Sequence, residues 1–215
     1  MSKKLIFIDC DSTLSAIEGI DELARLRGEA TFQACVDMTN RAMDGEIALE
    51  AVYGERLKLI APSLEESLAI GQQYIDAVEP KALELVQWLK SHAWLPVIIS
   101  GGITQVIEPF AAFLEIDRLE AVPLVFDETG TYAGFVETAP TARMGGKIEI
   151  IDRFKTEFKP DALVMVGDGS SDLETKEHVD LFIGYGGFVT REKVKAEADV
   201  FVRSLSEIPS ILDAM

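Results

Sequence analysis

Five short apolar runs, each continuous rather than interrupted by polar residues, constrain the fold of this chain more than any other feature. They lie at residues 5–8, 96–99, 163–166, 181–183 and 200–202. Continuous apolar runs of this length are typical of strands buried on both faces, as in a parallel sheet covered by helices. Amphipathic segments such as residues 80–92 lie between the runs, so the sequence predicts an α/β fold with a mainly parallel sheet.

One long segment interrupts this alternation of strands and helices. Residues 15–77 contain only helical patterns, at residues 17–27, 32–43, 47–60 and 64–75. We therefore expect a helical cap over residues 15–77, inserted after the first strand, and an α/β core made of residues 1–14 and 78–215. Inside the core, two β-rich runs at 122–126 and 131–136 flank a turn that contains glycine, which predicts a hairpin.

The charge balance restricts the possible partners. The chain has 37 Asp and Glu against 20 Lys and Arg, which leaves a formal net charge of −17 over 215 residues. Because nucleic acids and anionic membrane surfaces carry the same sign of charge, we expect neither as a partner. An acidic protein that binds an anionic substrate needs local positive charge from a metal ion or from a few Lys and Arg. The balance fits a monomer and a homodimer equally.

The sequence also indicates a compartment. The first apolar run ends before Asp9, short of the ~7–15 apolar residues of a signal-peptide core, and no run approaches the ~18 of a membrane span. Cys10 and Cys35 are the only cysteines, too few for a disulfide framework, although one bridge between them is a possible alternative. We therefore expect a protein of the reducing cytoplasm.

Acidic and small polar residues follow three of the apolar runs. Asp9 and Asp11 follow the first run, Ser100 follows the second, and Asp168 and Asp172 follow the third. The carboxyl ends of the strands are where open α/β sheets build their active sites. A single acid at such a place can simply cap the next helix, but several carboxylates that gather there repel one another and need a cation. Oxygen donors favour a hard ion, Mg²⁺ rather than Zn²⁺.

Other chemistries lack the residues they require. A nucleotide-binding P-loop needs glycine where Thr141 stands before Gly146. The two histidines, His92 and His178, do not follow strand runs, which argues against a His-based triad. Cys10 lies between two acids, which disfavour a thiolate, so we expect it to be structural.

Taken in order along the chain, these motifs resemble those of the haloacid dehalogenase-like phosphatase superfamily. They are Asp9-x-Asp11-x-Thr13, then Ser100, then Lys147, then Gly167-Asp168-Gly169-x-x-Asp172. The resemblance implies a Rossmann-like sheet with a small helical cap after the first strand. It also implies a Mg²⁺-dependent phosphomonoesterase that acts on a small phosphorylated substrate through a phosphoaspartate intermediate.

The same resemblance implies a role for each motif residue. Asp9 would be the nucleophile, and Asp11 the general acid and base. The implied Mg²⁺ ligands are Asp9, the backbone carbonyl of Asp11, and Asp168, with Asp172 supporting the metal through water or as a hydrogen-bond acceptor. The groups implied to hold the phosphoryl oxygens are Ser100, Gly101 and Lys147.

Residues 18–24 are most similar to superfamily members that hydrolyse L-phosphoserine to L-serine and phosphate. In that case Glu18 would receive the substrate amine and Arg56 the carboxylate, since an arginine can bind a carboxylate through two parallel hydrogen bonds. The apolar wall of the substrate site would be formed by Met43 and Leu49.

Two positions depart from the family pattern. Ser171 stands where Asn is usual and would still contact the substrate, although it reaches less far. Leu49 stands where an aromatic side chain is familiar. The substrate therefore stays open between L-phosphoserine and another small ester such as histidinol phosphate, and the acceptor between water and another alcohol such as homoserine. A catalytically silent protein that binds a metal or a partner is the alternative from another class.

Overall fold

A computed structural model describes residues 4–43 and 49–215 of the chain. Within these ranges, the side chains of residues 40, 42, 43, 49 and 50 are not described. The side chains of Met43 and Leu49, which the sequence analysis assigned to the wall of the substrate site, therefore lie outside the described part of the chain.

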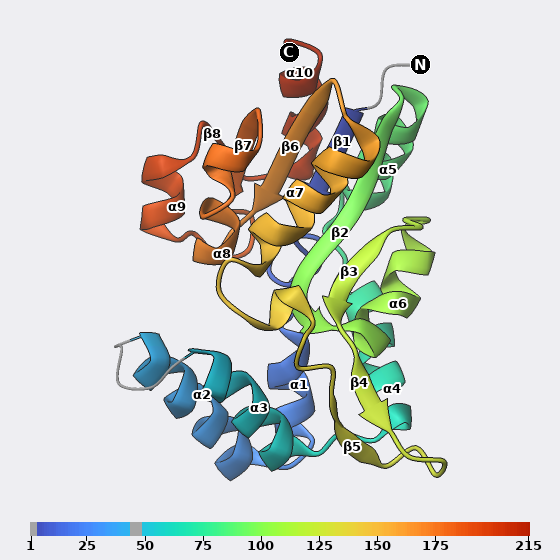
Figure 1. The fold of residues 1–215 in the computed structure, drawn as a ribbon, viewed down its shortest axis with the longest axis vertical. Helices are drawn as coiled ribbons and strands as arrows, with labels where there is room; N and C mark the ends of the chain where they lie inside the picture. Colours follow the sequence, from blue (N-terminus) through green and yellow to red (C-terminus); the bar gives the residue numbers. More distant parts are fainter. Residues whose placement is uncertain (1–3, 44–48) are drawn as a thin grey trace.

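Six parallel strands form the central sheet, in the order β3-β2-β1-β6-β7-β8 (Figure 1). Their bounds are β1 Lys4–Ile8, β2 Trp94–Ile103, β3 Leu119–Val122, β6 Ala162–Gly167, β7 Leu181–Tyr185 and β8 Val200–Val202. The α/β prediction is confirmed, and five of the strands lie on the five apolar runs. The edge strand β3 was not predicted, because its four residues include Glu120 and only its last residue is fully buried.

Helices cover both faces of this sheet. One face packs against α5 (Ala82–Ser91), α6 (Thr104–Phe113) and α10 (Ile208–Leu212), and the other against α7 (Gly146–Phe158), α8 (Ser170–Leu173) and α9 (Glu192–Glu197). Along β1, Ile6 and Ile8 belong to the first core cluster, whereas Leu5 and Phe7 belong to the second. Burial on both faces explains why the run is apolar at every position.

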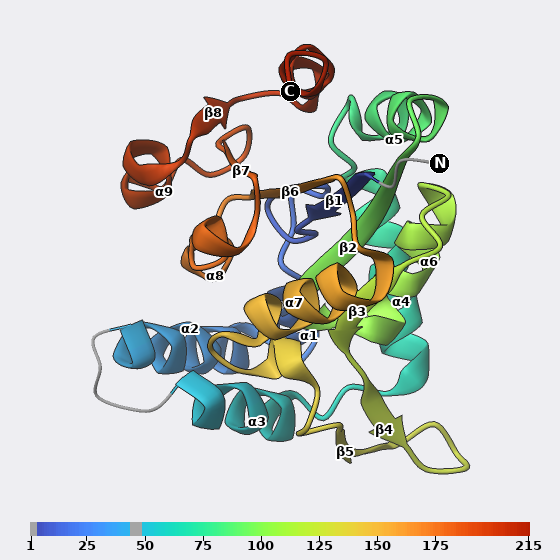
Figure 2. The same ribbon diagram turned by 45° about the horizontal axis from the view of Figure 1, so that its top comes forward.

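Four helices lie between β1 and α5, as the sequence predicts. They are α1 (Gly19–Arg25), α2 (Glu29–Met43), α3 (Leu49–Ile60) and α4 (Leu64–Asp76). In both views α2 and α3 lie side by side, away from the sheet, whereas α4 packs along α6 (Figures 1 and 2). The chain leaves and re-enters the sheet region at one place, because Ser15 forms β-bridges with both Asp11 and Val78.

The start of α4 is fixed by its own sequence. The Ser63 hydroxyl accepts a hydrogen bond from the Glu66 backbone N–H, and the Glu66 carboxylate accepts one from the Ser63 N–H. This capping box satisfies two amide groups that the first helical turn leaves free. The Glu66 carboxylate also binds the Arg27 guanidinium at 2.6 and 2.7 Å, which joins the start of α4 to the end of α1.

The predicted hairpin is confirmed as the antiparallel pair β4 (Leu124–Phe126) and β5 (Tyr132–Phe135). It reaches toward α3, where the rings of Tyr53 and Phe135 lie 5.4 Å apart. The described residues also include three short 3-10 helices: η1 (Pro140–Ala142), η2 (Lys176–His178) and η3 (Leu205–Glu207).

The structure bears on two expectations from the sequence, one about membrane-spanning helices and one about a cysteine bridge. In the described part of the chain, no helix is both long and apolar enough to span a membrane. Cys10 and Cys35 are buried free thiols, so the alternative of a bridge between them is wrong for this structure.

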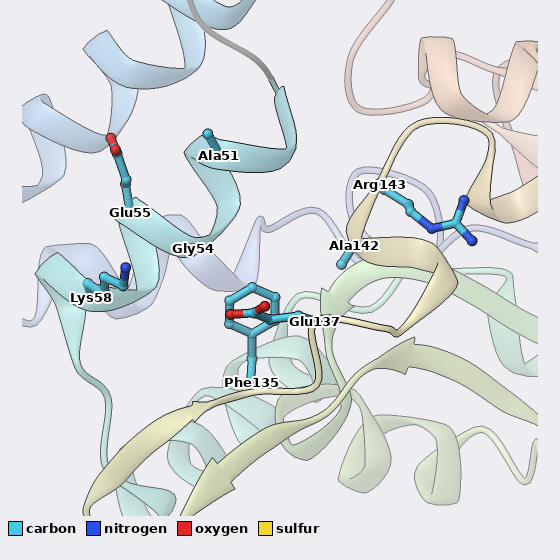
Figure 3. Close-up of a pocket in the computed structure, with 8 residues that line it drawn as sticks. All are labelled: Ala51, Gly54, Glu55, Lys58, Phe135, Glu137, Ala142 and Arg143. Carbon is cyan, nitrogen blue, oxygen red and sulfur yellow. The ribbon is translucent and has the colours of Figure 1, made fainter.

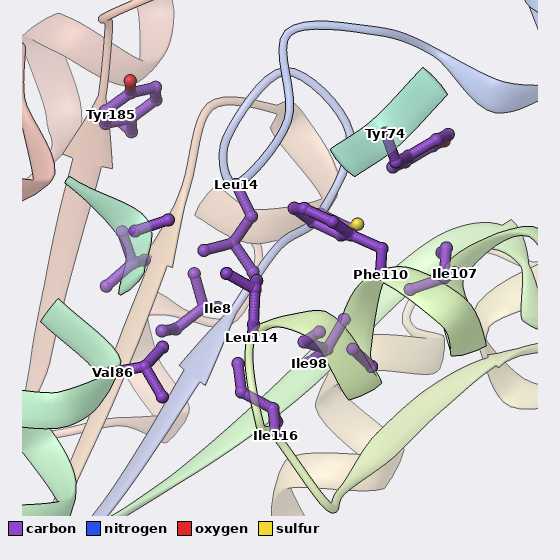
Figure 4. Packing of buried hydrophobic residues seen from close by; sticks show 14 of the residues in the cluster. Ile8, Leu14, Tyr74, Val86, Ile98, Ile107, Phe110, Leu114, Ile116 and Tyr185 are labelled. Carbon is purple, nitrogen blue, oxygen red and sulfur yellow. The ribbon is translucent and has the colours of Figure 1, made fainter. Parts of the chain in front are cut away.

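Phe110 of α6 lies in the middle of the larger core cluster. Its ring contacts that of Tyr74, with centroids 5.7 Å apart, and Figure 4 shows it between Leu14, Tyr74 and Ile107. Its side chain is fully buried, whereas Phe113 on the same helix is 37% exposed.

We expect Phe110→Ala to lower the free energy of unfolding by about 3–5 kcal/mol, because the substitution leaves a cavity between α4 and α6. Phe113→Ala is the matched control and should cost about 1 kcal/mol or less. Urea denaturation of both variants at neutral pH measures the difference, and equal losses would contradict this account of the core.

Candidate active site

Two neighbouring strands bring the acidic motifs together. Strands β1 and β6 are paired in parallel, with Ile8 opposite Val166, and the Asp9 N–H continues the ladder to the Val166 carbonyl at 2.9 Å. The loop after β1 and the loop after β6 therefore leave the same edge of the sheet. Thr13 from the first loop donates to Asp168 of the second at 3.1 Å.

Lys147, in the first turn of α7, is the positive centre of this edge. Its ammonium lies 2.8 Å from Asp9 Oδ1 and 2.6 Å from Asp172 Oδ1, and its side chain is 6% exposed. Burial alone would lower the pKa of Lys147, but the charges of Asp172 and Asp9 outweigh it, so that the pKa is raised. Lys147 therefore stays charged at all physiological pH values.

The backbone before Lys147 is tightly confined. Gly146 begins α7, and a Cβ atom at this position would lie 1.7 Å from the Pro140 carbonyl oxygen. Only glycine allows η1 to approach the start of the helix this closely. The neighbouring Gly145 is different, because nothing lies within 4 Å of a Cβ there, although its φ of +71° favours glycine.

Three buried carboxylates face one another at the same edge. Oxygen atoms of Asp9, Asp168 and Asp172 all lie within 4.8 Å of one another. Burial, followed by repulsion from Asp172, raises the pKa of both Asp9 and Asp168. Three carboxylates that are ionised together require more positive charge than the Lys147 ammonium supplies. Hard oxygen donors in a buried group of this size fit a divalent cation such as Mg²⁺.

The two oxygens of Asp172 already have partners. Oδ1 binds Lys147, and Oδ2 accepts a hydrogen bond from the Gly169 N–H at 2.9 Å. Asp168 is less constrained, since its partners are Thr13 and the exposed side chain of Arg191, whose Nε lies 3.0 Å from Oδ2. Both carboxylates thus have two partners, but those of Asp172 include the buried Lys147 ammonium, whereas one partner of Asp168 is an exposed side chain.

The sequence predicts Ser100 just after its strand. In the structure Ser100 instead lies inside β2. Strand β2 continues to Ile103, with an irregular register against β3 between Ile99 and Ile103. The buried Ser100 hydroxyl accepts a hydrogen bond from the Gly102 N–H at 2.9 Å. The irregular register turns this short segment, with Gly101 in it, toward the same cavity as Lys147.

Asp11 points in another direction from Asp9. Its Oδ1 accepts a hydrogen bond from the hydroxyl of Tyr74, on α4. Burial and the nearby charge of Glu18 raise the pKa of Asp11 to about 8, against the opposing effect of that hydrogen bond. A carboxyl group whose pKa is raised in this way holds its proton at a higher pH than an ordinary aspartic acid does.

Glu18 and Arg56 come from the helical segment after β1 and line the same cavity as Asp9 and Lys147. The Ser12 hydroxyl donates to Glu18 Oε1 at 2.7 Å, and burial raises the pKa of Glu18. One terminal nitrogen of Arg56 forms an ion pair with Asp21. Among the described residues, the Arg56 Nε is one of three buried side-chain atoms without a hydrogen-bond partner, so this guanidinium retains capacity for another acceptor.

One cavity of about 520 Å³ joins these groups. Its lining includes Asp9, Asp11, Glu18, Arg56, Ser100, Gly101, Lys147, Asp168 and Ser171. Of the residues predicted for the site, Asp172 lies behind Lys147 rather than on the cavity wall, and the side chain of Met43 is not described. Ser171 is exposed on the short helix α8.

A second cavity, of about 470 Å³, lies between α3, β5 and η1 (Figure 3). Its described lining holds charged groups such as Glu55, Lys58 and Glu137 but none of the strand-end carboxylates. The side chain of Arg143 is directed away from α3 in Figure 3 and pairs with Glu149. The carboxylates that follow the strands therefore line the first cavity rather than this one.

Several residues in and around the site were not identified from the sequence. Tyr74 and Asp21 reach their partners from 63 and 35 positions away, and no local pattern marks such distant pairs. Arg191 resembles any exposed lysine or arginine near a helix start. Gly146 could have been noticed as part of a glycine pair, but its contact with Pro140 depends on the path of the whole loop.

Comparisons with known proteins agree with this geometry. The family model described as haloacid dehalogenase-like hydrolase matches residues 6–176. The chain belongs to this family. It is 37% identical over 214 residues to the phosphoserine phosphatase of Bos taurus, covering 99% of this chain and 94% of that one.

Two solved structures are similar along almost the whole chain. One is described as a phospho-aspartyl intermediate analogue of phosphoserine phosphatase and the other as a substrate-bound phosphoserine phosphatase complex. Each has a TM-score of 0.81 and 26% identity, and covers 98% of this chain and 99% of the other.

We expect Gly146→Ala to lower the free energy of unfolding by about 3 kcal/mol, because the added methyl group collides with backbone rather than with a flexible side chain. Gly145→Ala is the control, since its only cost is the left-handed backbone, about 1 kcal/mol. Chemical denaturation of both variants provides the comparison. A larger loss for Gly145→Ala would mean that the approach of η1 to α7 is misplaced.

Proposed function

We propose that this member of the family is a Mg²⁺-dependent phosphomonoesterase that hydrolyses L-phosphoserine to L-serine and phosphate. One observation carries the proposal: a single cavity is lined by Asp9 and Lys147 and also by Glu18 and Arg56. The first pair suits a phosphoryl group, and the second pair suits the ammonium and carboxylate of an amino acid. The relatives named above support the same substrate.

The first chemical step uses Asp9 and Asp11. An Asp9 oxygen attacks phosphorus, a new P–O bond forms, and the bond from phosphorus to the serine oxygen breaks. The proton carried by Asp11 moves to the leaving serine oxygen, so that serine departs as a neutral alcohol. The products of this step are L-serine, a phosphoaspartyl group at Asp9 and ionised Asp11.

The second step restores the enzyme. Ionised Asp11 takes a proton from a water molecule as the water oxygen attacks the phosphoaspartyl phosphorus. The bond from phosphorus to Asp9 breaks, phosphate leaves, and Asp9 is again a free carboxylate. Asp11 regains the proton that it gave to serine, so the two steps balance.

The phosphoryl oxygens require a positive and hydrogen-bonding surface throughout. The Lys147 ammonium, the Ser100 hydroxyl and the backbone at Gly101 supply it on one side of the cavity. Lys147 lies in the first turn of α7, where the helix dipole adds to its charge. Because Asp172 holds the ammonium, this charge is in place before the substrate arrives.

The metal site fits between the strand ends. Asp9, the backbone carbonyl of Asp11, and Asp168 hold the ion in this proposal, with Asp172 supporting from behind. A bound Mg²⁺ neutralises part of the negative charge that the substrate brings and polarises a phosphoryl oxygen. Arg191 occupies one oxygen of Asp168 at 3.0 Å and lies at an exposed edge, where its side chain has room to move.

Substrate selection is assigned to the four helices after β1. We propose that residues 15–77 form a cap, with residues 1–14 and 78–215 as the catalytic core. Glu18 receives the amine and Arg56 the carboxylate, with Ser171 and Met43 as further contacts. The buried thiols of Cys10 and Cys35 support a reducing compartment such as the cytoplasm.

The direct test is phosphate release from L-phosphoserine by the purified protein, with Mg²⁺ and with a chelator. We expect turnover with Mg²⁺ and none with the chelator. Asp9→Asn keeps the size of the side chain but removes its nucleophilic charge, so it should lower kcat by about 10³-fold or more. Histidinol phosphate and a simple aryl phosphate, assayed in parallel, define the substrate range.

The outcomes separate the alternatives. Preference for histidinol phosphate would retain the chemistry at Asp9 but overturn the assignment of Glu18 and Arg56. Release of the phosphoryl group to homoserine in place of water would make the protein a transferase. No turnover of any ester, with wild type and Asp9→Asn alike, would revive the catalytically silent alternative.

Arg56→Ala tests the carboxylate contact separately. We expect KM for L-phosphoserine to rise by about 10- to 100-fold, because a hydrogen bond between charged groups is lost, while kcat changes little. Histidinol phosphate has no carboxylate, so any turnover of that ester should be unaffected. Lys58→Ala removes an exposed cation from the same helix and serves as the control, with KM expected to stay within about twofold of wild type. An equal rise in KM for both variants would contradict the assignment.

A further inference from the structure

The hydrogen bond between Tyr74 and Asp11 links the two parts of the molecule at the reacting atoms. Asp11 follows β1, whereas Tyr74 lies near the end of α4, in the helical segment between β1 and α5. The roles assigned above to the cap and the core do not require such a contact. It therefore calls for its own explanation, which rests on the proposed function.

Tyr74 is held rigidly in three ways. Its side chain is fully buried, and its ring packs against Phe110 with centroids 5.7 Å apart (Figure 4). Its backbone carbonyl accepts a hydrogen bond from the Ser15 hydroxyl at 3.2 Å. A side chain fixed by packing and by its backbone presents its hydroxyl in one position without further loss of conformational freedom.

The space for this hydroxyl depends on a glycine. A Cβ atom at Gly19, the first residue of α1, would lie 2.5 Å from the Tyr74 hydroxyl oxygen. The Tyr74 hydroxyl therefore passes over a part of α1 that has no side chain, and in this way reaches Asp11. The contact follows from the packing of α1, α4 and the loop after β1 together.

The two oxygens of Asp11 face different surroundings. Oδ1 accepts from Tyr74, whereas Oδ2 is directed to the end of β2, where it would lie 3.0 Å from a Cβ atom built at Gly102. The Ser100 hydroxyl would lie 3.1 Å from the same Cβ position. The second oxygen of Asp11 is thus directed to the end of the cavity that holds the phosphoryl group.

We propose that Tyr74 is a positioning residue for Asp11. Its hydroxyl occupies Oδ1 as a donor, which leaves Oδ2, the oxygen directed to Gly102 and Ser100, as the one that holds and transfers the proton. In the first step that proton passes to the leaving serine oxygen, and in the second step the same oxygen accepts a proton from water. Tyr74 itself neither gains nor loses a proton.

Tyr74→Phe tests this role because it removes one oxygen and retains the ring that packs on Phe110. For L-phosphoserine, whose alkoxide leaving group requires protonation, we expect kcat/KM to fall about tenfold, chiefly through kcat. For 4-nitrophenyl phosphate, whose leaving group departs without a proton, kcat/KM should stay within about twofold. The value of kcat/KM reports the steps up to formation of the phosphoenzyme. The ratio of kcat/KM for the two substrates therefore isolates the transfer of the proton to the leaving group.

Tyr185→Phe is the matched control. Tyr185 is a buried tyrosine on β7 whose hydroxyl binds Glu79 rather than Asp11. The control should change thermal stability without changing the ratio between the two substrates. If Tyr74→Phe does not fold, Gly19→Ala leaves the tyrosine in place but displaces its hydroxyl. The same loss is then expected with ethyl phosphate, whose alkoxide leaving group requires a proton but which has no amine for Glu18 to bind.

The results distinguish this proposal from the proposed function. A wild-type protein that turns over neither ester refutes the proposed function and, with it, the role of Tyr74. An active wild type with equal loss on both esters in Tyr74→Phe, or no loss on either, overturns the positioning role alone. A loss seen only with L-phosphoserine supports the proposal.

Discussion

The rest of the site depends on the charge balance between three crowded carboxylates and the buried ammonium that contacts two of them. Asp9, Asp168 and Asp172 approach within 4.8 Å of one another, and in a buried environment such an arrangement is unstable without positive charge. Lys147 supplies one charge by contacting Asp9 and Asp172 together. Burial and the remaining repulsion from Asp172 raise the pKa of Asp9, and the charge imbalance favours a divalent cation at this place. A divalent cation bound there would supply the local positive charge that a chain with a net charge of −17 needs to receive an anionic substrate.

The fold meets this requirement with few elements. Pairing of β1 with β6 brings two acidic loops to one edge, and the start of α7 brings the lysine to the same place. The irregular end of β2 adds Ser100 from the other side of β1. Each group comes from a backbone position fixed by sheet pairing or by a helix start, so the site is organised before any ligand binds. The Tyr74 contact adds a group from outside the sheet at the place where proton transfer is proposed.

The sequence predicted the parts of this arrangement that depend on local pattern. The parallel sheet, the hairpin and the four consecutive helices follow from apolar periodicity, and the strand-end acids follow from their place after each apolar run. Strand β3 was missed because a short, half-buried edge strand has no distinct period. Ser100 was placed after its strand, because nothing in a short apolar run shows that pairing continues through two glycines. Asp21 and Tyr74 have partners 35 and 63 positions away, and only the packing of the helices brings them together.

The bridges of Ser15 to Asp11 and to Val78 have a consequence for the history of such a fold. Because the chain leaves the sheet and returns to it at adjacent points, the intervening helices can be exchanged for another segment without altering the register of β1 with its neighbours. A chain with this joint can change what it recognises while its hydrolytic chemistry stays intact. That freedom is limited by the packing of α4 along α6 and, on the proposal made for Tyr74, by the need to supply a partner for Asp11.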